Sequence, residues 1–183
     1  MKYFIDIKLL PDDDIPIYFL RNKIYAKFHK ILFTLNSTDI GISFPNYKVK
    51  LGNIIRLHGT ENSLLNLQAT NWLGGLSGYC DVSGIQAIPN EVVYRTISRK
   101  QSNMTEAKLR RLIKRGSISE DETKEYKAKM FQQSLDNPYL ELESRSNGHK
   151  HRRYIQFRAL SSQVVEGEFD QFGLSKTATI PWF

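Results

Sequence analysis

The side chain best suited to proton transfer in this sequence is His29, because an imidazole titrates close to neutral pH. His29 follows Phe28 in a stretch whose apolar residues recur at helical spacing. With about 100° between successive helix residues, His29 lies roughly 120° from the centre of that apolar stripe. We therefore expect a half-shielded imidazole at the edge of the core. The residue alone leaves open an ordinary surface histidine.

A polar loop with hydroxyl groups adjoins a basic run later in the chain. The loop is Ser144-Arg-Ser146-Asn-Gly148, and His149-Lys-His-Arg152-Arg153 follows it. The alternative is a plain turn, since Asn-Gly favours hairpins. We find no glycine-rich phosphate loop before a helix and no paired carboxylates of the kind that a two-metal nuclease needs.

A predicted strand over 92–101 carries groups that could recognise bases. Arg95, Arg99 and Gln101 project to one face by the two-residue period. Arginine can pair with O6 and N7 of guanine, and glutamine with N6 and N7 of adenine. The deep groove of A-form RNA admits such contacts only near a stem end or loop. Taken alone, these residues favour a plain edge strand whose charges prevent aggregation.

Positive charge concentrates just after this strand. Between Arg95 and Arg115 stand eight Lys or Arg residues and one acid, Glu106, so this stretch carries +7, as much as the whole chain. A predicted helix over 104–115 has a narrow apolar stripe, and its other faces carry Lys108, Arg110, Arg111, Lys114 and Arg115. These cations repel one another unless an anion lies alongside. We therefore favour a nucleic-acid partner over a solvated amphipathic helix.

Composition excludes several classes of protein. The single Cys80 allows no intramolecular disulfide, which fits a reducing, cytoplasmic setting. The four histidines show no zinc spacing, and His149 and His151 are too close together to be convincing ligands. No apolar run is long enough to cross a membrane, and the first residues do not resemble a signal peptide. We expect a cytoplasmic protein with no metal, no cofactor and no membrane partner.

The elements that must position these residues follow from hydrophobic periodicity. In the first half we expect strands over 3–9, 40–44, 53–58 and 79–88, with helices over 15–35 and 63–73. The apolar stripe of the first helix comprises Ile17, Leu20, Ile24, Phe28, Ile31 and Leu35. Strand, helix, strand, strand, helix, strand is the ferredoxin-like order. Many unrelated proteins share this fold, so it does not define a function.

The second half has a different pattern. After the strand over 92–101, capping boxes beginning at Asn103 and Ser119 predict helices over 104–115 and 119–133. Possible paired strands follow over 139–142 and 153–160. We predict an α+β protein with a ferredoxin-like domain over 1–90 and an α+β RNA-binding domain over 91–183.

Six motifs in the same order resemble one known family. They are the His29 helix, Ile40-Gly-Ile-Ser-Phe-Pro45, Tyr94-Arg-Thr-Ile-Ser-Arg99-Lys-Gln101, the Arg-rich helix, Ser144-Arg-Ser146-Asn-Gly148, and Phe172-Gly-Leu-Ser-Lys176 with a final Pro-Trp-Phe. Together they span nearly the whole chain. The pattern is similar to the CRISPR-associated pre-crRNA endoribonucleases of the I-F subtype.

This resemblance implies a function and a set of roles. It implies a single metal-free cut at the 3′ base of the repeat stem-loop, after which the enzyme stays on its product and joins the surveillance complex with other CRISPR-associated proteins. By resemblance, His29 transfers the proton and Ser144 holds the attacking 2′-hydroxyl. Arg99 and Gln101 match the readers of the lowest base pairs, and Arg111, Lys114 and Arg115 match the groove-binding helix. Lys108, Arg110 and Ser146 extend the predicted RNA-binding set.

Two positions depart from the family pattern. The family usually has tyrosine before Gly-Leu-Ser, where this chain has Phe172, so a phenol that would help to orient the histidine is missing. The family usually stacks a phenylalanine on the terminal base pair, whereas this basic loop offers Arg152 or Arg153. Two other functions therefore stay open, a non-catalytic holder of the guide-RNA hairpin and a general RNA-recognition module.

Overall fold

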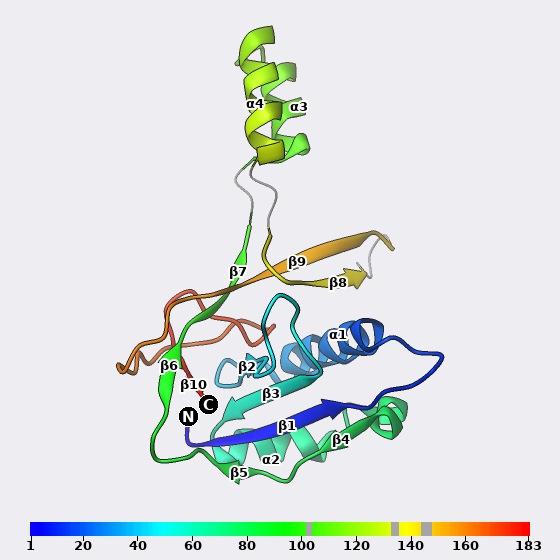
Figure 1. Ribbon diagram of the computed structural model, residues 1–183, viewed down its shortest axis with the longest axis vertical. Helices are drawn as coiled ribbons and strands as arrows, with labels where there is room; N and C mark the ends of the chain where they lie inside the picture. The colour runs from blue at the N-terminus through cyan, green and yellow to red at the C-terminus, as the bar shows by residue number, and fades with distance from the viewer. Residues whose placement is uncertain (102–103, 133–135, 144–147) are drawn as a thin grey trace.

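The computed structural model describes residues 1–101, 104–132, 136–143 and 148–183. The protein combines helices with antiparallel sheets, which confirms the predicted α+β class. Figure 1 shows a sheet with its helices at one end of the molecule, a three-stranded sheet beside it, and a helical pair that projects from the opposite end. None of the helices in the described part of the chain is long and apolar enough to cross a membrane.

The first sheet is built from residues 3–87. Its strands are hydrogen-bonded in the order β2-β3-β1-β4, and β5 also pairs with β1. The strands and helices of this half are β1 Tyr3–Leu9, α1 Ile17–Leu35, β2 Gly41–Ser43, β3 Ile54–Gly59, α2 Glu61–Ala69, the short 3₁₀ helix η1 Gly74–Tyr79, β4 Cys80–Val82 and β5 Gln86–Ala87.

Helix α1 forms along most of the predicted stripe, but it begins at Ile17 rather than at 15, and Leu35 is exposed. Leu20, Ile24 and Phe28 are buried, and Tyr25 and Leu32 join them in the core. The helix ends at Asn36, which adopts the left-handed conformation and donates its backbone N–H to the carbonyl of Leu32. His29 is half-buried, as its position beside the stripe predicted.

Two predicted elements of this half differ in the structure. The helix expected over 63–73 begins earlier, at Glu61, because Thr60 caps it through the backbone N–H of Ser63, and it ends at Ala69. The single strand expected over 79–88 is wrong. It is divided into β4 and β5, and Ser83 between them accepts a hydrogen bond from the backbone of Asp6.

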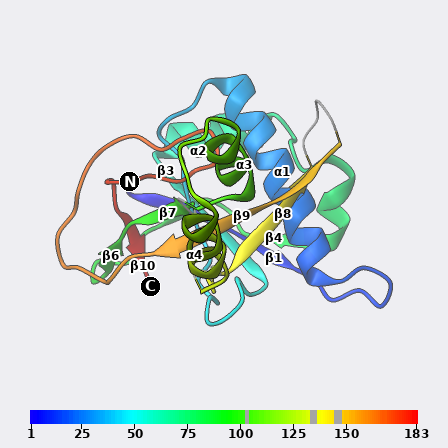
Figure 2. The same cartoon turned by 90° about the horizontal axis from the view of Figure 1, so that it is seen from above.

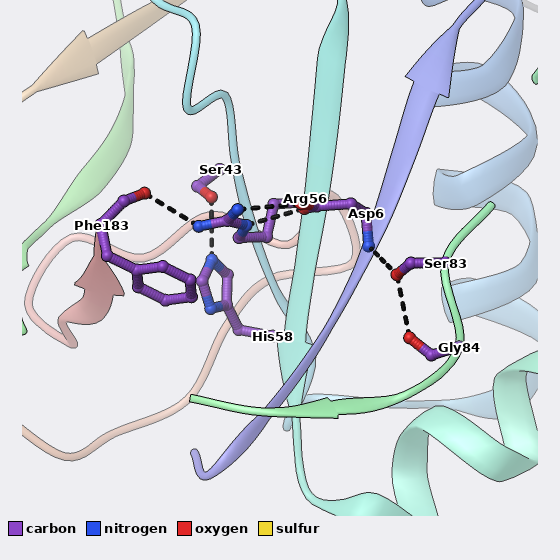
Figure 3. Close-up of polar contacts among 7 residues, drawn as sticks. All are labelled: Asp6, Ser43, Arg56, His58, Ser83, Gly84 and Phe183. Carbon is purple, nitrogen blue, oxygen red and sulfur yellow. Dashed lines mark hydrogen bonds and ion pairs between the residues drawn. The ribbon is translucent and has the colours of Figure 1, made fainter. Parts of the chain in front are cut away.

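The last residues of the chain return to the first sheet. Phe4 on β1 is buried because the ring of Phe183 packs edge-on against it at 5.0 Å. Arg56 on β3 lies over both rings. It forms an ion pair with Asp6 at 2.7 Å and donates a hydrogen bond to the backbone oxygen of Phe183 (Figure 3). Phe169, Leu174 and Ile180 of the same C-terminal segment are buried in one core with the first sheet and α1.

The single strand predicted over 92–101 is wrong, because the chain changes sheets at Thr96. Before it, β6 Val93–Arg95 pairs with β10 Ile180–Trp182. After it, β7 Ile97–Lys100 joins β8 Tyr139–Glu143 and β9 Lys150–Phe157 in the order β7-β9-β8. Strand β9 begins three residues before the predicted start at 153. The expected common face of Arg95, Arg99 and Gln101 is lost as a result.

Helices α3 Glu106–Lys114 and α4 Glu120–Gln132 pack together and project away from the sheets (Figure 1). Figure 2 shows the same pair from above. The capping box at Ser119 is confirmed, since Ser119 and Glu122 exchange hydrogen bonds. Asn103 lies outside the described residues, and the N-cap of α3 is Thr105, whose hydroxyl accepts from the N–H of Lys108. The predicted start of this helix is corrected accordingly.

Candidate active site

The imidazole of His29 is held on two sides. Its Nδ1 lies 2.8 Å from the backbone oxygen of Gln171. Its ring stacks on Phe172, with 3.6 Å between ring centres and 9° between planes. Both contacts come from the segment after residue 169, which lies 142 positions away in sequence. These two contacts therefore hold His29 in place, although Phe172 has no phenol hydroxyl.

The contact with Gln171 determines the neutral tautomer of His29. A carbonyl oxygen can only accept a hydrogen bond, so Nδ1 must carry the proton. In the neutral imidazole the other nitrogen, Nε2, then has a free lone pair. His29 is consequently arranged to accept a proton through Nε2, while the backbone holds the ring in place.

Phe172 lies between His29 and a buried cation. The guanidinium carbon of Arg153 is 3.4 Å from the centre of the Phe172 ring. Two groups this close to one ring centre must occupy opposite faces, so Arg153 covers the face that His29 leaves free. Arg153 is only 6% exposed, and burial lowers its pKa. Its Nε finds no hydrogen-bond partner among the described residues. The Phe172 ring thus gives this guanidinium a cation–π contact.

The backbone of residues 170–174 positions this ring. The Asp170 carboxylate accepts from the N–H groups of Phe172 and Leu174, at 2.9 and 3.0 Å. Gly173 has φ of 71° and its carbonyl accepts from Ile42 on β2. A Cβ at Gly173 would lie 2.9 Å from the Phe28 ring. Only glycine fits this turn without strain.

Tyr25 also lies close to Phe172. Its ring lies 6.0 Å from that of Phe172, and its hydroxyl donates to the Phe172 backbone oxygen at 3.2 Å. Burial raises the pKa of this phenol, so it stays protonated as a donor. The phenol of Tyr25 on α1 therefore binds the backbone of Phe172, the residue that stands where the family usually has tyrosine.

A cavity of about 920 Å³ opens beside His29, between α1 and the β8–β9 hairpin. Its lining includes Phe172 and three lysines of α1, Lys23, Lys27 and Lys30. The opposite wall includes Glu143 at the end of β8 and His151 on β9. Concave sites with a few convergent polar groups are the usual places for ligands. Ser144 follows Glu143 directly, but Ser144 and Ser146 lie outside the described residues.

The predicted base-reading pair stays together. Arg99 is an exposed residue of β7, and Gln101 follows the strand. In the amide orientation that satisfies both groups, the Gln101 oxygen accepts from the Arg99 guanidinium at 3.1 Å. Arg95 is separate from them. It lies over Trp182 at 4.6 Å and donates to the carbonyl of Arg158.

The predicted cationic helix presents its charges to solvent. Leu109 is buried, whereas the five cations named above, Lys108, Arg110, Arg111, Lys114 and Arg115, are exposed. Arg110 reaches Glu106 at 3.5 Å, a weak surface pair. Arg152 lies on another surface, over the ring of Tyr139 at 4.5 Å.

Comparison with known proteins identifies the family. Residues 4–183 match the family model described as "CRISPR-associated protein (Cas_Csy4)". The chain is 36% identical over 184 residues to "CRISPR-associated endonuclease Cas6/Csy4" of Escherichia coli strain UTI89, with all of both chains covered. It is 33% identical over 187 residues to the protein of the same name from Pseudomonas aeruginosa strain UCBPP-PA14, again over the full length of both.

The chain belongs to the Cas_Csy4 family. This confirms the resemblance inferred from the six motifs. Sequence reasoning missed several residues around His29 in this Cas_Csy4 protein, namely Tyr25, Asp170 and Gln171. Gln171 acts through its backbone, which has no side-chain signature. Its position next to Phe172 was the only available signal. Among the described residues, no group of three or more His, Cys, Asp or Glu is placed to hold a metal ion.

Proposed function

We propose that this protein is a metal-independent endoribonuclease that recognises the CRISPR repeat stem-loop. It cleaves pre-crRNA once, at the 3′ base of the stem, and leaves a 5′-hydroxyl and a 2′,3′-cyclic phosphate. Membership of the Cas_Csy4 family supports this function, as does the name of the two relatives. The exposed cations of α3 suit an RNA partner.

The observation that carries the proposal is the hydrogen bond from Nδ1 of His29 to the carbonyl of Gln171. It leaves Nε2 able to take the proton of a 2′-hydroxyl. RNA supplies its own nucleophile, so the enzyme must align that oxygen with the phosphorus and remove its proton. Ser144 holds the hydroxyl in this scheme. Ser144 follows Glu143 in the sequence, and Glu143 lines the cavity, which supports the assignment.

Recognition is assigned to three groups of residues. Arg99 and Gln101 read the lowest base pairs, and their adjacency supports a joint role. The α3 cations Lys108, Arg110, Arg111, Lys114 and Arg115 bind the phosphates of the stem. Arg152 and Ser146 bind RNA at the β8–β9 hairpin. The predicted RNA contact of Arg153 stays a prediction, and its buried place against Phe172 supports a role in holding that ring.

The fold and the partners are proposed on the same basis. The strand order β2-β3-β1-β4 supports a ferredoxin-like domain in residues 1–90, with residues 91–183 as the RNA-binding domain. We assign the protein to the cytoplasm. There it stays on the mature crRNA and joins other CRISPR-associated proteins in the type I-F surveillance complex.

The test is cleavage of a labelled repeat hairpin under single-turnover conditions in excess EDTA. We expect one cut below the stem by the wild type, and loss of about 10²- to 10⁴-fold in rate for His29→Ala. A 2′-deoxy residue at the cut site should bind normally and resist cleavage. Tight binding with no cut by either protein would instead favour the non-catalytic hairpin holder.

A further inference from the structure

A second imidazole faces the cavity that contains His29. His151, on β9, lines the wall opposite α1. The side chains of His151 and Arg153 point to the same face of β9, because residues two apart on a strand share a face. Arg153 touches Phe172, and Phe172 stacks on His29, so this face of β9 is directed at the catalytic histidine.

The hairpin holds His151 on this face. His151 pairs with Leu142 on β8, and Arg153 pairs with Leu140. Both leucines are buried, and β8 packs against α1. A shift of register by one residue would expose both leucines, so packing enforces the register. His151 itself is exposed and therefore accessible to a substrate in the cavity.

The reaction needs a second proton transfer. When the 2′-oxygen attacks phosphorus, the bond from phosphorus to the 5′-oxygen breaks, and this leaving oxygen needs a proton. His29 enters the step with Nδ1 committed to Gln171 and Nε2 engaged by the proton of the 2′-hydroxyl. A distinct acid can therefore act on the leaving oxygen in the same step.

We propose that His151 is this acid. In the step, the 2′-hydroxyl proton passes to Nε2 of His29 and the 2′-oxygen bonds to phosphorus. The bond from phosphorus to the 5′-oxygen breaks, and the imidazolium of His151 gives that oxygen its proton. The products are a 2′,3′-cyclic phosphate and a 5′-hydroxyl. The assignment rests on the proposed endoribonuclease function.

The lysines of the same cavity are weaker candidates for the acid. The ammonium group of Lys27 donates a hydrogen bond to the carbonyl oxygen of Leu73 at 2.6 Å. Imidazole is the side chain that most often serves as a general acid or base, whereas an ammonium group more often binds phosphate as a fixed charge. Lys23 and Lys30 suit binding of the phosphate.

The test uses a substrate whose leaving group needs no acid. The 5′-oxygen at the cut site is replaced by sulfur in the repeat hairpin, because a thiolate departs without protonation. Wild type, His151→Gln, His149→Gln and His29→Ala are compared on both hairpins, in EDTA and at saturating protein. His149→Gln is the matched control, because His149 does not line the cavity.

We expect His151→Gln to cut the oxygen hairpin about 10²- to 10⁴-fold more slowly than wild type, and the sulfur hairpin at a rate close to wild type. His29→Ala should be slow on both, and His149→Gln slow on neither. Equal impairment of His151→Gln on both hairpins, or no impairment, would overturn the assignment. If the wild type itself cuts neither hairpin, the endoribonuclease function fails first.

Discussion

Phe172 lies between His29 and Arg153, so we expect any effect of Arg153 on catalysis to pass through this ring. If Arg153 is replaced by glutamine, one face of Phe172 loses its cover and the stack on His29 loosens. We expect the single-turnover cleavage rate of Arg153→Gln to fall by about 10- to 100-fold, because small misplacements of a catalytic group are costly. RNA affinity, measured by titration, should change little.

Arg152→Gln is the matched control, because it removes the same charge from the neighbouring residue, which lies over Tyr139. It should weaken binding and leave the cleavage rate of the bound RNA unchanged. A loss of affinity in Arg153→Gln with normal cleavage of the bound RNA would show instead that Arg153 contacts RNA directly.

The turn over 170–174 is the element on which the position of Phe172 depends. Gly173→Ala forces a side chain into a left-handed conformation and toward Phe28 and Ile42. We expect a loss of roughly 1–3 kcal/mol in the free energy of unfolding, measured with urea. Cleavage should also fall.

Gly84→Ala provides the comparison for this turn, because a Cβ added at Gly84 would have no other atom within 4 Å. This variant should stay within about 0.5 kcal/mol of wild type. Equal stability of the two variants would contradict the role assigned to the turn.

Helix α3 should contribute affinity without sequence preference. Arg111→Gln removes one exposed cation, so we expect weaker binding to every stem tested. The slope of log affinity against log salt should decrease in magnitude by about one. Lys127→Gln on α4 is the control and should leave the slope unchanged. An unchanged slope in Arg111→Gln would remove this residue from the interface.

Helices and strands were predicted best from the sequence where one face of the element packs on a single core or where its cap is made by neighbouring residues. The stripe of α1 needed only helical periodicity, and Ser119 and Glu122 needed only local hydrogen bonds. The two-residue period places Phe4 on the face of β1 opposite Ile5 and Ile7, yet Phe4 is buried because Phe183 covers it. Likewise, the two-residue period fails for Arg95 because Thr96 moves the chain to another sheet. Such contacts depend on distant residues that periodicity does not detect.

At the scale of the whole molecule, a buried histidine makes stability depend on pH. His58 is fully buried, and Ser43 Oγ lies 2.8 Å from its Nε2 (Figure 3). Burial, with the nearby charge of Arg56, lowers the pKa of His58 to about 3 from its ordinary 6.5. Between pH 6.5 and about 3, His58 binds a proton in the unfolded chain but stays neutral in the folded protein. The free energy of unfolding therefore decreases as the pH falls below 6.5, the ordinary pKa that His58 has in the unfolded chain.

We expect the protonation of His58 to lower the free energy of unfolding by about 1.4 kcal/mol for each unit by which the pH falls between 6.5 and about 3. Urea unfolding at about pH 7 and about pH 5 should therefore differ by about 2 kcal/mol from this residue alone. The double variant Ser43→Ala with His58→Leu removes both polar partners, and its stability should vary less with pH. An equal dependence in the two proteins would exclude His58 as the source.

The return of residues 169–183 to the first sheet also sets an order of events during synthesis. A ribosome delivers His29 well before Gln171 and Phe172, and these two residues hold the imidazole. A growing chain can already form α1, yet its histidine lacks a defined tautomer and a stacking partner. The hydrogen-bonded and stacked imidazole is therefore completed only after Gln171 and Phe172 have been made, late in translation.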